Sequence, residues 1–162
     1  MRAQAGSSGN LSGMGGSTGS VYRSCTNMSG LLLLTQKTIQ TMKTRYGPKA
    51  KDNRPLEIFE QVLTDLKSVD KLMKKLMTVS EKNPAPSSLD QSQTIVGVVQ
   101  KCKETIEGIL KYVDDYHKRT SIMQIWHEKA ITSKIKANHE SMLRYKAMIE
   151  QLSEQFLTQH SN

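Results

Sequence analysis

Apolar residues recur at helical spacing along most of the chain and rarely alternate as they would in a strand. The clearest case is segment 56–77, LEIFEQVLTDLKSVDKLMKKLM, whose apolar residues form two adjacent stripes. One stripe contains Leu56, Phe59, Leu63, Leu66, Met73 and Met77. The other contains Ile58, Val62, Val69, Leu72, Leu76 and Val79. Two adjoining stripes predict a helix that packs against at least two neighbours inside a bundle.

Both stripes are candidate protein-binding surfaces, because a stripe that the chain does not cover itself would need a partner. Leu66 and Leu72 lie on different stripes, so we expect them to face different neighbours. Aspartate at either position would bury a carboxylate without a partner. We therefore expect Leu66→Asp and Leu72→Asp to release different contacts.

A second helical region follows the proline-containing linker 83–88. Residues 89–159 contain no proline, and their apolar seam predicts a long coiled-coil helix. Between Met123 and Ile135 the seam advances in steps of four only, which indicates either a stutter or a break where two helices fold back. The break would lie near residues 118–124, and the sequence leaves open whether there is one helix or two.

The C-terminal part of this seam is a further candidate protein-binding surface. It contains Ile131, Ile135, Asn138, Met142, Tyr145, Ile149, Leu152 and Phe156. Asn138 is the polar member, and it either fixes register and partner choice or faces solvent at the edge of the seam.

The N-terminal part combines a Gly/Ser-rich segment with a shorter helix. Seven of the ten glycines lie in the first 30 residues, so we expect a disordered tail over residues 1–29. Residues 30–82 then predict two helices joined by a basic loop, 43–54, which is either a solvated loop or a contact for an acidic partner. Gly47 and Pro48 predict the end of the first helix at Tyr46. The expected fold is all-α: an elongated helical bundle or coiled coil with a disordered tail.

Charge is distributed unevenly and argues against direct nucleic-acid binding. Residues 1–55 carry eight Lys or Arg residues and one acidic residue, whereas residues 56–162 carry fifteen and fourteen. The predicted helical body is therefore nearly neutral, while nucleic-acid readers carry basic charge on a folded face. The run LLLL at 31–34 is far too short to span a bilayer, so we expect no membrane partner.

No motif for catalysis or cofactor binding is present, so we expect a protein that is not an enzyme and has no cofactor or small-molecule substrate. Asp114, Asp115 and His117 lie within one helical turn but lack a further ligand for a metal site, so a solvated polar face is the better interpretation. His139 and His160 are expected to be exposed. Only two cysteines occur, Cys25 and Cys102, which is typical of a reducing compartment.

Three local patterns together resemble the Mediator subunit 30 family of transcription coactivator subunits. TQKTIQ at 35–40 is similar to a Gln-x-Thr-[Val/Ile]-Gln pattern in a short helix. Leu66-Lys67, Leu72, Lys74-Lys75-Leu76, Val79 and Glu81-Lys82 follow the order of a second pattern. KIKANHESMLRYKAMIEQL at 134–152 is similar to a C-terminal coiled coil rich in Lys, Asn, Gln and Leu. The resemblance covers roughly residues 30–82 and 128–157.

The resemblance implies a non-catalytic nuclear protein that packs against other helical subunits of a complex linking regulators to RNA polymerase II. The alternative is a coiled-coil adaptor of vesicle, ciliary or kinetochore machinery, with a cytoplasmic location. The family supplies no catalytic or metal-binding residues.

Overall fold

The described part of the chain consists of four long helices. The computed structural model describes the backbone of residues 16–46, 54–82, 89–118 and 121–160, with side chains over 21–44, 57–81, 91–118 and 129–155. The helices are α2 (Gly16–Tyr46), α3 (Arg54–Lys82), α4 (Leu89–Lys118) and α5 (Ser121–His160). No strand occurs within these four segments, so the all-α prediction is confirmed there. At 1.5 Å per residue the helices are about 45–60 Å long.

Helix α2 begins well before the residue that the sequence pattern indicated. We expected a disordered tail to residue 29, but the helix extends from Gly16 and its side chains are packed from Val21 onward, so the expectation is wrong for residues 21–29. Val21, Cys25 and Met28 are fully buried and extend the heptad spacing of Leu32 toward the N-terminus. Burial of these three side chains offsets the poor helix propensity of the surrounding Gly and Ser residues. Residues 1–15 of the expected tail lie outside the described part.

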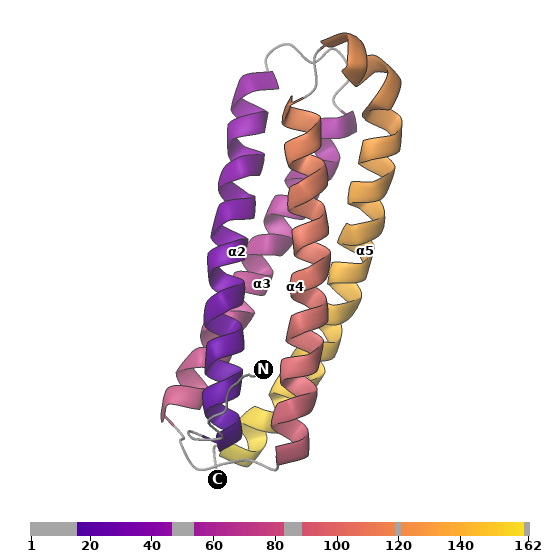
Figure 1. Ribbon diagram of the computed structural model, residues 1–162. Coiled ribbons are helices and arrows are strands. Elements are labelled where there is room, and N and C mark those ends of the chain that lie inside the picture. The colour runs from indigo at the N-terminus through magenta and orange to yellow at the C-terminus, as the bar shows by residue number, and fades with distance from the viewer. Residues whose placement is uncertain (1–15, 47–53, 83–88, 119–120, 161–162) are drawn as a thin grey trace, which may run out of the picture.

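Residues 89–159 form two helices rather than one. Helix α4 ends at Lys118 and α5 begins at Ser121, within the range 118–124 where we expected a break and just before the seam begins its steps of four. The two helices run in opposite directions and pack against each other along their length (Figure 1). The change of spacing therefore marks a fold-back and not a stutter.

The four helices lie side by side as two antiparallel hairpins (Figure 1). Helices α2 and α3 form one hairpin, and α4 and α5 form the other. Helix α2 of the first hairpin packs on α4 of the second, and α3 packs on α5 more sparsely. Helices α3 and α4, although consecutive in the chain, are therefore diagonal neighbours.

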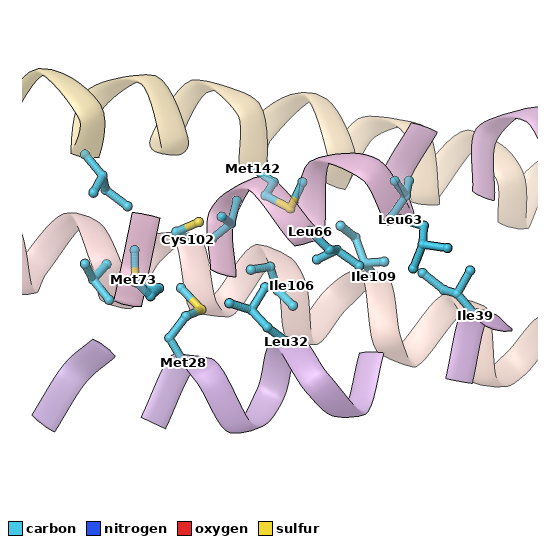
Figure 2. Close-up of a cluster of buried hydrophobic side chains, with 14 of the residues drawn as sticks. Met28, Leu32, Ile39, Leu63, Leu66, Met73, Cys102, Ile106, Ile109 and Met142 are labelled. Carbon is cyan, nitrogen blue, oxygen red and sulfur yellow. The ribbon is translucent and has the colours of Figure 1, made fainter. Parts of the chain in front are cut away.

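One apolar core runs through the centre of the four helices, and each helix contributes to it (Figure 2). Its largest fully buried side chains are Phe59, Met28, Leu32, Ile39, Met42, Leu66, Met73, Leu76, Ile95, Ile106 and Ile109. Full burial of a side chain of this size contributes about 1.5–3 kcal/mol relative to exposure. The apolar seams of the chain are thus largely covered by the chain itself.

The core changes character from one end to the other. At one end the rings of Phe59 (α3) and Tyr116 (α4) meet edge to face across the diagonal, with centroids 5.5 Å apart. At the other end Ser80, Ser92 and Ser153 occupy buried positions of α3, α4 and α5. The serines lie at about one level. Asp65 contacts His139, and Ser80 and Ser153 follow these two residues by 15 and 14 positions in helices that run in the same direction. Gly108 contacts Asn138, the neighbour of His139, and Ser92 lies 16 positions before Gly108 in α4, which runs in the opposite direction.

Candidate protein-binding surfaces

The two stripes of α3 merge into one face, and the centre of that face lies in the core. Its fully buried residues come alternately from the two stripes: Phe59, Leu66 and Met73 from one, and Val62, Val69 and Leu76 from the other. This arrangement arises because α2 and α5 cover α3 from two sides. Leu63 is buried as well, and the side chain of Leu56 falls outside the described part. The stripes are therefore not left open for other subunits, which corrects the expectation from the sequence.

The flanks of this α3 face remain half-buried. Ile58 and Leu72 lie on one flank and are packed against the edge of the core. Asp65 occupies the same flank, and its Oδ2 lies 2.7 Å from Nε2 of His139 on α5. This flank therefore faces α5. On the opposite side, Lys43 of α2 forms an ion pair with Glu60 of α3.

The buried face of α5 differs from the predicted seam by a rotation about the helix axis. Of the seam residues, Ile131, Ile135, Met142 and Ile149 are buried, Asn138, Tyr145 and Leu152 are half-buried, and the side chain of Phe156 is outside the described part. His139, which we expected to be exposed, is only 6% exposed, and Ser153, 14 positions further along α5, is also buried. The rotation follows because α5 packs on α3 as well as on α4.

Asn138 lies at the α4–α5 contact opposite a glycine. A Cβ atom placed on Gly108 of α4 would lie 3.0 Å from Oδ1 of Asn138. Nδ2 of Asn138 donates a hydrogen bond to the carbonyl of Lys134 in its own helix at 3.1 Å. The side chain thus occupies the space that Gly108 leaves, at the edge of a shallow groove. This groove is lined by Lys101, Glu104, Thr105, Asn138 and Tyr145.

A lysine on α5 also contacts α4. Nζ of Lys134 lies 5.3 Å from the ring centroid of Tyr112, within the range of a cation–π interaction. Together with the Gly108–Asn138 approach, this contact aligns the two helices of the second hairpin. The register of α5 therefore depends on specific polar and aromatic contacts as well as on apolar packing.

The polar residues Asp114, Asp115 and His117 of α4 are half-buried, and Asp114 forms an ion pair with the exposed Lys118. Nζ of Lys118 lies 2.8 Å from Oδ2 of Asp114, and hydrogen bonding to this carboxylate raises the pKa of Lys118. Among the described side chains, no three His, Cys, Asp or Glu residues gather as metal ligands would. Burial raises the pKa of both Cys25 and Cys102 to about 12, so both thiols remain protonated at neutral pH and pack as small apolar groups.

The sequence interpretation missed a surface on the outer side of α2. We define the α2 outer face as Arg23, Asn27, Gly30, Leu33, Leu34, Lys37 and Thr41, all of which are exposed. Leu33 and Leu34 are 55% and 53% exposed, although both are large apolar residues. The run LLLL contained the signal, because four consecutive residues of a helix cannot all face one core. Only Leu32 of this run is fully buried.

No described helix combines the length and apolar character that crossing a membrane requires. Comparison of the chain with protein-family models, with curated proteins and with solved structures found no match.

Proposed function

We propose that this protein is a non-catalytic helical scaffold subunit of a multiprotein complex, in which its helices pack as an elongated coiled-coil bundle. The observation that carries the proposal is the exposed pair Leu33 and Leu34 on the α2 outer face. Apolar side chains exposed side by side on a rigid helix are typical of a surface that another protein covers. The core beneath α2 holds this helix in place without needing the partner.

The resemblance to the Mediator subunit 30 family makes a Mediator-type transcription coactivator the specific form of the proposal. TQKTIQ at 35–40, one of the resembling patterns, lies on α2 directly after the exposed leucines. In this role the protein would act in the nucleus, where it would help to link regulators to RNA polymerase II. Its partners would be other helical subunits of the same complex.

The test is purification of the tagged full chain at its native expression level, with identification of the proteins that co-elute. We expect a stable set of helical subunits of a transcription coactivator, retained after nuclease treatment. Elution of the chain alone would contradict the scaffold role. Co-elution with vesicle, ciliary or kinetochore proteins would contradict the coactivator assignment and favour the adaptor alternative.

A further inference from the structure

We propose that the α2 outer face binds an acidic amphipathic helix of a partner subunit, with Gly30 as the point of closest approach. The proposal rests on the scaffold function above and names the chemistry of one partner. Arg23, Asn27, Gly30, Leu34, Lys37 and Thr41 follow one another in steps of four and three, which is the spacing of a helix–helix seam. This second seam lies on the side of α2 opposite its core residues, such as Leu32.

Gly30 has no role inside the chain. A Cβ atom at this position would meet no other atom within 4 Å, and the residue lies in the middle of a 31-residue helix. A glycine there makes the helix less stable than an alanine would. What glycine provides is a notch that lets another backbone come close. Leu33 and Leu34 lie one turn further along the helix, so the notch and its apolar neighbours form one site.

The charge of α2 defines the partner further. The helix contains four basic residues and no Asp or Glu. Lys43 is engaged by Glu60 of α3, whereas Arg23 and Lys37 have no acidic partner among the described residues. These two cations lie at the two ends of the seam, about 21 Å apart at 1.5 Å per residue. A complementary helix carries carboxylates about four turns apart, with small and apolar residues between them.

A second copy of this chain does not fit the same face. If two α2 helices crossed antiparallel at Gly30, Arg23 of each would approach Lys37 of the other. If they crossed parallel, each cation would approach its own counterpart. Like charges would face each other in both arrangements, which opposes self-association. The acid-free seam therefore favours a different, acidic helix.

The first experiment identifies what covers the face in the native assembly. The tagged full chain carries the photoreactive residue p-benzoylphenylalanine at Asn27, one turn from Gly30, and in a matched control at Gln93 on the outer side of α4. Mass spectrometry then reads the crosslinked peptide. We expect Asn27, and not Gln93, to yield a segment of another protein with net negative charge and apolar residues at i, i+3, i+4 and i+7.

The second experiment measures binding of that crosslinked segment, made as a synthetic peptide, to the purified full chain. We expect Gly30→Ala and the double variant Leu33→Ser/Leu34→Ser each to weaken binding at least tenfold. Gly97→Ala is the control, because a Cβ there also meets no atom within 4 Å, and it should leave the affinity unchanged. Gly30→Ala should raise the Tm while it weakens binding, which excludes unfolding as the cause.

The outcomes separate this inference from the proposed function. The inference is overturned by unchanged affinity of Gly30→Ala, by a crosslink to a second copy, a lipid, a nucleic acid or a non-acidic peptide, or by no crosslink at Asn27 in an intact assembly. In each of these cases a stable set of co-purifying subunits would leave the scaffold function standing. Purification of the chain without any partner would overturn both.

Discussion

Three glycines, Gly30, Gly97 and Gly108, lie in the parts of the helices whose side chains the structure describes, and their surroundings differ. Open space surrounds the Cβ position of Gly30 and of Gly97, whereas that of Gly108 lies 3.0–3.2 Å from the amide of Asn138. We expect Gly30→Ala and Gly97→Ala each to raise the free energy of unfolding by about 0.5–1 kcal/mol, through the helix propensity of alanine. Gly108→Ala should instead lower it by about 1 kcal/mol, because the added methyl group displaces Asn138.

Urea denaturation followed by circular dichroism compares the three variants at constant m value. Adding Asn138→Ala to Gly108→Ala should restore the lost stability, since the clash is then removed. If Gly108→Ala alone stabilised the protein as much as Gly97→Ala, Asn138 would move freely and would not set the register of α4 and α5.

The contact between Asp65 and His139 could not be predicted from the sequence. We expected His139 to be exposed, and it lies between polar residues. Its partner Asp65 is 74 positions away in the chain, so no local pattern indicated the contact. In the structure the side chain of His139 is only 7% exposed, and it makes a polar contact between α5 and Asp65 of α3. The burial of a histidine depends on the partner that the tertiary fold brings to it, and a single sequence does not show that partner.

We expect His139→Ala to lower the free energy of unfolding by about 1.5–3 kcal/mol, because it removes a partly buried hydrogen bond and leaves the Asp65 carboxylate without its partner. Lys74→Ala is the matched comparison. Its ammonium pairs with Asp70 within α3 but is 68% exposed, so the loss should stay below about 0.5 kcal/mol. A double-mutant cycle on Asp65 and His139 measures their coupling, and a coupling energy near zero would contradict a specific pair.

At the scale of whole helices, local signals predicted the ends better than the faces. The end of α2 at Tyr46 agrees with the residue that Gly47 and Pro48 indicated, and the interruption between α4 and α5 lies within the predicted range 118–124. The start of α2 was not predicted because the Gly/Ser-rich composition indicated disorder, although the segment contains the buried residues Val21, Cys25 and Met28. The faces of α3 were divided into two stripes because a sequence does not show which neighbouring helix covers which side.

Leu66 and Leu72 of α3 were assigned to different stripes, so substitutions at the two positions test whether the stripes are equivalent. Leu66 is fully buried, whereas Leu72 is half-buried on the flank that faces α5. We expect Leu66→Ala to cost about 2–5 kcal/mol of unfolding free energy, and Leu72→Ala about 1 kcal/mol or less. Leu66→Asp should then unfold the chain itself. The sequence alone had suggested that this substitution would release a partner. Equal losses for the two alanine variants in denaturant titrations would restore the two-stripe interpretation.

At the scale of the whole molecule, we expect the two ends of the core to differ in stability. The aromatic end contains Phe59 and Tyr116, and the opposite end contains three serines at one level. Oγ of Ser80 is buried and has no hydrogen-bond partner among the described residues. A buried hydroxyl without a partner lowers the stability of the fold. The serine end is therefore where the helices should separate first on heating.

We expect Ser80→Ala to raise the free energy of unfolding by about 1 kcal/mol, since it removes an unsatisfied buried hydroxyl. Ser153→Ala serves as the control, because its Oγ already donates a hydrogen bond to the carbonyl of Ile149 at 2.6 Å, and its effect should be smaller. Thermal unfolding of both variants provides the comparison. A loss of stability in Ser80→Ala would indicate that the hydroxyl binds a buried water molecule.

The arrangement of two hairpins has a consequence for the continuity of the chain. Contacts between α2 and α4 and between α3 and α5 join the hairpins, and none of them requires that Lys82 be connected covalently to Leu89. Two separate polypeptides, cut between these residues and produced together, should therefore reassemble into the same four helices. Each fragment alone would leave its half of the core exposed and would associate with itself. The melting temperature of the reassembled pair, unlike that of the intact chain, should rise with concentration.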